Sequence, residues 1–410
     1  MAIDHIATAD LLGEHLTADP FAFYEDLRKL DGPVYNERHN AWLIAGYDDV
    51  GAAYPDPRLS SDRVRPLLAV LGDEQRKRVG PMLEILARWM VVTDPPAHTR
   101  LRKLANTAFK QQRVAAMGEW IGGLVDDMLD EMIASGGQDF VAGLAYPLPA
   151  TVITKLMGAP AEDAAKFQHW SDELALVAFG GGGNRGDRHE RALRGVTEMQ
   201  SYLAELIAKA KAAPGSDMVS VLIASESVDG DHLFEDELIA LCTLILFAGH
   251  ETTTNLLCNA VVTLTSHPEQ FERLRANPDL TNGAVEEILR FQGPIKTVQR
   301  WVTEDHIRDG HQLRAGETVF LMNASANRDE RVFARGGEFD IARPSQPLHI
   351  AFGRAAHSCL GAQLARLEAR IALPKIIERL PQLAVAEPVR FKPSIASRAV
   401  EGLRVNYETR

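Results

Sequence analysis

Hydrophobic positions recur with helical spacing over much of the chain. Between residues 115 and 135, apolar side chains follow the three- and four-residue spacing of one helix face. Similar patterns predict further helices at 198–210, 236–265, 268–276, 280–291 and 362–377. The longest predicted helix ends just before a His-Pro pair at 267–268, which is a typical stop signal. We therefore expect helices to dominate from about residue 95 to residue 290.

Strand patterns are short and lie toward the ends of the chain. Two apolar runs at 33–35 and 41–44 flank a polar turn, which predicts a β-hairpin. Further short strands are expected at 297–302, 318–322 and 402–407. With no internal repeat and no linker-like stretch, residues 1–410 predict one mainly α-helical domain with small β-sheets.

One glycine-rich segment interrupts the helical patterns. Gly180 to Gly183 are consecutive glycines, followed by Asn184 and Gly186. This composition is typical either of a hinge for a mobile lid or of an ordinary exposed loop.

Composition limits the class of protein. The 410 residues can bury a large core, and 46% hydrophobic with 24% charged residues is ordinary for a soluble globular protein. Lys and Arg number 44 against 56 Asp and Glu, a net charge of −12, so we expect no nucleic-acid partner.

Three cysteines, too few for a disulfide framework, are typical of a protein in a reducing compartment. The N-terminus does not read as a signal peptide, and the apolar run 238–248 is too short for a membrane span. We expect a cytoplasmic protein with no membrane contact.

The most informative segment places a cysteine directly before a predicted helix. Residues 352–361 read Phe-Gly-Arg-Ala-Ala-His-Ser-Cys-Leu-Gly. Backbone N–H groups at the start of a helix are unpaired and favour a thiolate there. Such a thiolate can be the axial ligand of a haem iron. The alternative is a buried structural cysteine. A zinc site at His357 and Cys359 would need further ligands that the spacing does not offer.

This segment resembles the haem-binding loop of the cytochromes P-450, which reads Phe-Gly-x-Gly-x-His-x-Cys-x-Gly. Ala355 departs from that pattern, because it stands where the family usually has glycine. A glycine would allow a positive φ there, which alanine adopts at a cost of about 1–2 kcal/mol. The matching residues are Phe352, Gly353, His357, Cys359 and Gly361.

Three other segments resemble the same family, in its order and spacing. Residues 248–253 read Ala-Gly-His-Glu-Thr-Thr inside the longest predicted helix, and residues 287–290 form Glu-x-x-Arg. Residues 94–102 resemble the start of a helix that bears a His and an Arg four residues apart. The resemblance covers essentially the whole chain. It implies the triangular cytochrome P-450 fold of the soluble bacterial type, with haem between the long central helix and the cysteine-loop helix.

The resemblance also implies how the cofactor, haem b (iron protoporphyrin IX), is held. Cys359 would be its axial iron ligand. Basic residues would hold the two propionates, and arginine suits a carboxylate because it can pair with both oxygens. For any one of these side chains alone, solvated surface charge is the alternative. The four basic residues are His98, Arg102, Arg300 and His357.

Two pairs on predicted helices carry further expectations. Ala248 and Thr252 share a helix face, and a Thr hydroxyl can bond the carbonyl four residues earlier. Glu251 beside Thr252 suits a proton relay, which makes this pair the predicted catalytic residues; an ordinary core helix is the alternative. Glu287 and Arg290 have the spacing of an ion pair. An exposed ion pair would add little to the stability of the fold. The resemblance instead implies that this pair lies in the core near the cysteine loop, where it would serve folding and haem retention.

The substrate pocket is expected along the same helix and near the C-terminus. Its residues are apolar, so an apolar organic substrate is expected, although plain core packing is the alternative. The predicted lining residues are Leu244, Phe247, Ala248, Ile295, Val298 and Ile395.

Together the resemblance implies a monomeric haem-dependent monooxygenase that inserts one atom of O2 into its substrate by hydroxylation. Electrons would come from a ferredoxin and an NAD(P)H-dependent ferredoxin reductase. Two alternatives remain: a peroxide-driven haem-thiolate enzyme, which would not need the Glu251–Thr252 pair, and a non-catalytic haem-binding protein, which would need no relay.

A basic segment suggests where the electron donor docks. Residues 95–118 contain no acidic side chain, which is unusual in so acidic a chain. With Arg354 they would border the haem on its cysteine side and attract an acidic iron–sulfur protein; a solvated helix face is the alternative. Apart from Arg102, which would hold haem, the basic residues are expected to face solvent: Arg100, Lys103, Lys110 and Arg113.

Overall fold

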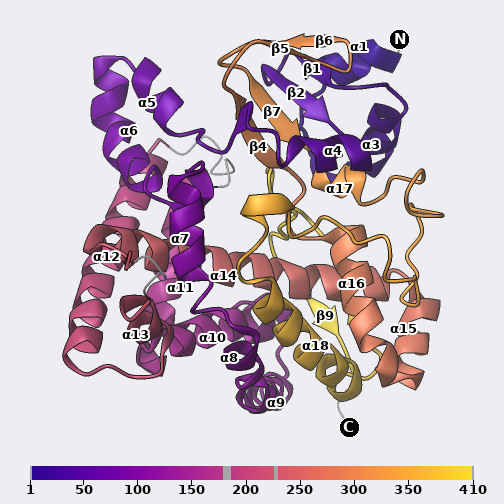
Figure 1. Cartoon of the computed structure of the whole chain (residues 1–410). Helices are drawn as coiled ribbons and strands as arrows, with labels where there is room; N and C mark the ends of the chain where they lie inside the picture. The colour runs from indigo at the N-terminus through magenta and orange to yellow at the C-terminus, as the bar shows by residue number, and fades with distance from the viewer. Residues whose placement is uncertain (1, 179–185, 226–229, 409–410) are drawn as a thin grey trace.

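The computed structural model describes residues 2–178, 186–225 and 230–408 (Figure 1). The proposed hinge at Gly180–Asn184 lies outside these residues. The helices are α1 (Ala2–Ala7), α2 (Glu14–Ala18), α3 (Phe21–Arg28), α4 (Tyr47–Ala53), α5 (Arg65–Val70), α6 (Asp73–Leu86), α7 (Ala97–Ala105), α8 (Gln111–Ala115), α9 (Gly118–Ala134), α10 (Pro147–Met157), α11 (Ala164–Ala178), α12 (Arg188–Ala212), α13 (Met218–Ile223), α14 (Glu235–Thr265), α15 (Pro268–Ala276), α16 (Thr281–Gln292), α17 (Asn323–Ala326) and α18 (Ala362–Arg379).

Short strands and tight helical turns complete the fold. The strands are β1 (Val34–Asn36), β2 (Ala41–Ile44), β3 (Leu59–Ser60), β4 (Val298–Val302), β5 (His306–Arg308), β6 (His311–Leu313), β7 (Thr318–Leu321), β8 (Ala384–Val385) and β9 (Val405–Asn406). The 3-10 turns are η1 (Met90–Val92), η3 (Ala161–Asp163), η4 (Pro278–Leu280) and η5 (Ala355–His357), while η2 (Val141–Ala145) is a short π-helix.

The helices agree closely with the apolar patterns. α15 has the predicted bounds, and α14 begins one residue earlier than predicted. The predicted helix at 198–210 is only the second half of α12, which begins at Arg188. Its first turns are rich in charge, so their apolar face is harder to recognise in the sequence.

The main sheet joins segments far apart in the chain. Its strand order is β1-β2-β7-β4-β3. β1 and β2 form the predicted antiparallel hairpin, with Val34 opposite Leu43. β2 pairs in parallel with β7, and β4 runs antiparallel to both β7 and β3. This sheet lies at the end of the molecule that holds the N-terminus, while most of the long helices fill the remainder (Figure 1).

Helix α14 crosses the middle of the molecule and belongs to two buried clusters (Figure 1). Its second half packs with α9, α10, α16 and α18. Its first half packs with α6, α10, α11 and α12. Burial on nearly every face explains its almost continuous apolar sequence, and it places Cys242 and Cys258 in the core. No helix within the described ranges is both long enough and apolar enough to cross a membrane.

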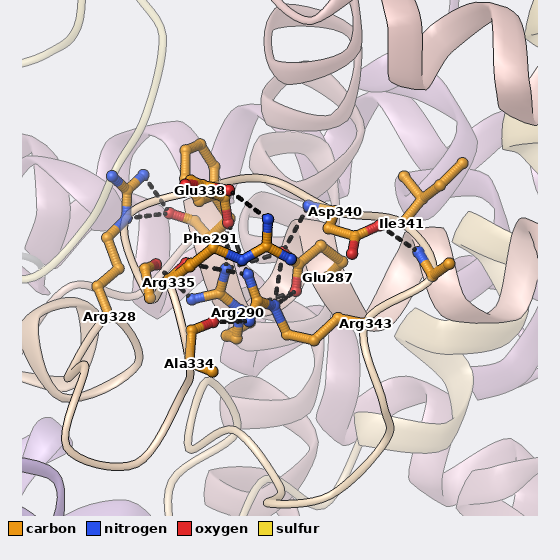
Figure 2. Close-up of polar contacts among 12 residues, drawn as sticks. Glu287, Arg290, Phe291, Arg328, Ala334, Arg335, Glu338, Asp340, Ile341 and Arg343 are labelled. Atoms are coloured by element: carbon orange, nitrogen blue, oxygen red, sulfur yellow. Dashed lines mark hydrogen bonds and ion pairs between the residues drawn. The ribbon is translucent and has the colours of Figure 1, made fainter.

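The Glu287–Arg290 pair ties α16 to the chain that leads into the cysteine loop (Figure 2). Both side chains are 2% exposed, and Arg290 Nε lies 2.7 Å from a Glu287 carboxylate oxygen. Arg290 also donates to the backbone carbonyls of Asn327, Gly336 and Glu338, and Arg343 pairs with Glu287 from the other side. Asn327 Oδ1 in turn accepts the N–H of Ile350 at 2.7 Å, two residues before the loop. The predicted ion pair is therefore present and buried, and the hydrogen bonds of Asn327 link it to the chain just before the cysteine loop.

Candidate active site

Cys359 lies between a tight turn and the first residue of α18. Turn η5 (Ala355–His357) precedes it, and α18 begins at Ala362. The backbone N–H of Cys359 donates to the carbonyl of Phe352 at 2.8 Å, which closes the loop. Burial raises the pKa of the Cys359 thiol, while hydrogen bonds from the N–H groups of Gly361 and Ala362, together with Arg102, act to lower it. These N–H groups at a helix start favour a thiolate, as the sequence predicts.

The thiol opens onto space inside the molecule. Its side chain is solvent-accessible, yet it is surrounded closely enough for burial to raise its pKa. The accessible sulfur therefore does not lie on an outer surface. In the part of the chain that the structure describes, no three His, Cys, Asp or Glu side chains are grouped to hold a metal ion.

Ala355 stands where the loop pattern has glycine, and it adopts a backbone conformation typical of glycine. This residue has φ of +57°, in the left-handed region that favours glycine. Gly353, two residues earlier, has φ of +71°. The loop therefore keeps the conformation expected of a glycine, and Ala355 adopts it at an energetic cost.

Basic side chains from three distant segments converge next to this loop. The rings of His98, on α7, and His357 lie 3.9 Å apart between centroids. Arg102, one turn further along α7, donates to the carbonyl of Ser358 at 2.6 Å. Arg300, on β4, is close enough to both histidines to lower their pKa values. The structure thus brings together all four residues predicted to hold propionates.

A fifth basic residue, Arg63, was not predicted from the sequence. It precedes α5, and burial together with Arg300 lowers its pKa to about 10. Arg63 also lowers the pKa of His357. In the sequence it is one arginine in a polar stretch, and only the folding of 60–64 against β4 brings it to this cluster.

These groups fit an anionic ligand. His98 Nδ1 and Arg300 Nη2 are buried and have no hydrogen-bond partner among the described residues. The nearby carboxylate of Asp94 is already bound by the hydroxyl of Ser60 and the N–H of Ser61. Buried donors without partners are costly, so a pair of carboxylates such as haem propionates would satisfy them. The residues present therefore fit a haem whose iron faces Cys359.

The middle of α14 has an accessible small residue and a hydroxyl. Ala248 is exposed, although α14 is buried from Ala240 to Phe247. Thr252 Oγ1 donates to the carbonyl of Ala248 at 2.7 Å, the bond expected from their spacing. The helix thus interrupts its buried face with a residue that allows close approach and with a hydroxyl beside it.

The carboxyl group of Glu251, next to Thr252 in the sequence, is enclosed by the protein. Its Oε2 atom is buried without a hydrogen-bond partner in the described ranges. Burial raises its pKa to about 7; Lys392 opposes this rise and Asp172 adds to it. A carboxyl group with a pKa near neutrality can take up and release protons under ordinary conditions, as a relay requires.

The predicted substrate-lining residues lie in several parts of the molecule. Phe247 stacks near Trp89, with ring centroids 5.6 Å apart, and Leu244 belongs to the same cluster. Ile395 packs instead against Phe23 and the N-terminal segment. Val298 is the first residue of β4 and Ile295 lies shortly before it; both are half-buried, whereas Ala248 is exposed. These residues belong to different packing clusters, and their role in substrate binding stays a prediction.

The expectation that Arg100 faces solvent is wrong. It pairs with Asp231 and Glu237 at the start of α14, so its charge is neutralised locally. Arg113 is exposed but donates to the carbonyl of Ser216. Lys103, Lys110 and Arg354 are exposed, as expected.

Comparisons with known proteins agree with this geometry. Residues 184–392 match the family model described as Cytochrome P450. The cytochrome P450 monooxygenase PikC of Streptomyces venezuelae is 38% identical over 91% of this chain and 87% of its own length. The vitamin D(3) 25-hydroxylase of Pseudonocardia autotrophica is 37% identical over 88% of this chain and 85% of its own. This chain belongs to the cytochrome P450 family.

Solved structures support the same assignment for the fold. P450BioI, in complex with an acyl carrier protein ligated to hexadec-9Z-enoic acid, aligns with a TM-score of 0.85 at 33% identity, covering 96% of this chain and all of that one. The predicted P450 fold is thus confirmed. As a member of the family the protein is a haem-thiolate monooxygenase that depends on O2 and on a redox partner.

Proposed function

We propose that this P450 binds haem b and hydroxylates an apolar organic substrate with electrons from a ferredoxin. The observation that carries the proposal is the accessible thiol of Cys359 beside a cluster of five basic groups, in a chain that also has a Glu–Thr pair in the middle of α14. When bound, the haem iron would supply dioxygen binding and cleavage, which an axial thiolate favours.

The chain's own residues would position the cofactor and deliver protons. His98, His357 and the arginines would hold the propionates by charge-assisted hydrogen bonds. Glu251 would pass a proton to Thr252, whose hydroxyl would release its bond to the Ala248 carbonyl and so become free to donate on the accessible side of α14. The Glu251–Thr252 pair supports an O2-dependent reaction over a peroxide-driven one, which needs no such donor.

An apolar substrate is supported by the side chains that precede Ala248 on α14. Leu244 and Phe247 are apolar, and Trp89 adjoins them. A pocket lined in this way retains molecules with little charge. Relatives point in the same direction, since one is named for hydroxylation of vitamin D(3) and another is bound to a carrier protein that holds a fatty acyl chain.

Docking of a ferredoxin is supported by exposed basic residues near the cysteine loop. Lys103, Lys110, Arg113 and Arg354 are exposed on α7, α8 and the loop. An acidic donor would be attracted to them, so the first electron transfer should slow steeply as salt increases. Charge reversal at Lys110 and Arg113 should weaken donor binding and leave substrate affinity unchanged. Salt-independent reduction by these variants and by the wild type would contradict the docking site.

The relay is tested with Thr252→Ala. This variant should keep haem content and substrate binding, because neither depends on the hydroxyl. It should divert electrons from hydroxylated product to hydrogen peroxide, since proton delivery is broken; a loss of about 10²-fold in product rate is typical of a removed acid–base group. Measuring product and peroxide per NADH consumed decides the matter. Wild-type coupling in Thr252→Ala would show that Thr252 only packs.

A further inference from the structure

A second group of polar side chains lies beside Glu251. Tyr146, at the start of α10, sets its ring edge-on against His250, with centroids 4.4 Å apart. The Tyr146 hydroxyl lies 3.4 Å from the carbonyl of Gln168 and donates to the carboxylate of Asp172 on α11. Helices α10 and α11 therefore hold a carboxylate in a defined place beside α14.

This outer carboxylate is accessible, whereas Glu251 is enclosed. The side chains of Asp172 and Lys392 are both exposed. Each is close enough to Glu251 to change its pKa, and Lys392 also acts on Asp172. Asp172 is thus an accessible acid near a buried one, whose Oε2 atom has no hydrogen-bond partner among the described residues.

Burial and four neighbouring groups act most strongly on the pKa of Asp172. Tyr146, Lys392 and His169 lower the pKa of Asp172, while Glu173 and, above all, burial raise it. His250 is the titratable residue next to Glu251 on α14. It is uncharged at neutral pH, because burial lowers its pKa to about 4. A proton that reaches Glu251 from this side therefore has Asp172 as its acidic donor.

We propose that Asp172, held in place by Tyr146, is the outer acid that returns a proton to Glu251 after each delivery to Thr252. This inference rests on the proposed relay and adds its connection to solvent. In the step, the O–H bond of Asp172 breaks, an O–H bond forms on Glu251, and the Asp172 carboxylate recovers a proton from bulk water. Tyr146 acts as a positioning residue, and Lys392 biases the transfer through its charge.

The first test measures the protonation of Glu251 without turnover. Infrared spectra of protein labelled with ¹³C-glutamate, compared with Glu251→Gln, identify the protonated carboxyl band, which is then titrated. Asp172→Asn should lower the pKa of Glu251, because a neighbouring negative charge is removed. Lys392→Gln should raise it, because a positive charge is removed. The matched controls Asp126→Asn and Lys166→Gln lie in other ion pairs and should leave it unchanged.

The second test measures proton delivery in the haem-loaded enzyme. Asp172→Asn should lower the rate of product formation about tenfold and raise the solvent deuterium isotope effect, because an amide cannot donate an acidic proton. Tyr146→Phe should show a smaller change in the same direction, since Asp172 keeps its acid but loses its hydrogen bond. Substrate-induced spectral shifts should stay unchanged in both variants.

The outcomes separate this inference from the function it rests on. If Glu251→Gln impairs coupling but Asp172→Asn behaves as wild type in rate and isotope effect, Asp172 is not the donor. If Glu251→Gln itself couples normally, the relay is wrong and this inference falls with it. Shifts of the Glu251 pKa in opposite directions, together with a slowed Asp172→Asn, establish the proposed route.

Discussion

Replacing Arg290 with alanine should prevent the protein from folding into a haem-binding form. Arg290 makes five hydrogen bonds while it is almost fully buried: two to the Glu287 carboxylate and three to the carbonyls of residues 327, 336 and 338. Its removal leaves Glu287 with Arg343 as its remaining cationic partner, at 3.1 Å. It also releases Asn327, which holds the chain at Ile350 just before the cysteine loop.

The size of the effect follows from these contacts. Breaking a buried ion pair costs about 3–5 kcal/mol. Each buried carbonyl left without a donor adds about 1–3 kcal/mol, although the three will not add fully. A loss above roughly 5 kcal/mol equals much of the total stability of an ordinary protein, which is about 5–15 kcal/mol. Arg290→Lys keeps the charge but cannot reach both carboxylate oxygens and three carbonyls, so it should fall between the alanine variant and wild type.

The assay is urea unfolding, with haem content measured on the same samples. Arg275→Ala is the matched control, because Arg275 pairs with Glu272 at the same i, i+3 spacing but is exposed. It should change stability by less than about 1 kcal/mol. A soluble Arg290→Ala protein with normal haem content and a loss below about 1 kcal/mol would refute the reasoning.

Two further changes test individual features. Ala355→Gly should stabilise the protein by about 1 kcal/mol in urea unfolding, because φ of +57° strains alanine; an unchanged midpoint would mean the loop relaxes elsewhere. Glu368→Gln tests a buried acid whose pKa is raised well above its usual value by burial. The native state keeps this proton after the unfolded chain has lost it, so wild-type stability falls as pH rises above about 4.3, by about 1.4 kcal/mol per pH unit. The glutamine variant should therefore gain relative stability between about pH 5 and about pH 7, and a difference independent of pH would contradict the assignment.

Local sequence patterns predicted most helices and strands, and also the contacts between residues of the same helix. The hairpin of β1 and β2, the bounds of α15 and the bond from Thr252 to Ala248 all follow from spacing, because each is a short-range feature. The left-handed conformation of Ala355 followed from the loop pattern.

Features that depend on packing between distant segments were not predictable. Arg63 reaches Arg300 only because residues near β3 fold against β4. Arg100 lies in a stretch without acidic residues, yet Asp231 and Glu237, which are 131 and 137 positions away, neutralise its charge. Glu368, between Arg366 and Arg370, reads as part of a solvated charged face, but it is 1% exposed and Oε2 has no partner in the described residues. The surroundings of each of these three side chains are formed by residues distant in the sequence. Spacing along the chain does not reveal such neighbours.

The central claim is that Cys359 is the only protein ligand to the haem iron. Its most direct test is the carbon monoxide difference spectrum of the reduced wild type and of Cys359→His. The wild type should show the red-shifted band that thiolate ligation produces, and Cys359→His should lose it, because Cys242 and Cys258 are buried in α14 and cannot replace the ligand. A red-shifted thiolate band that survives in Cys359→His would contradict the claim.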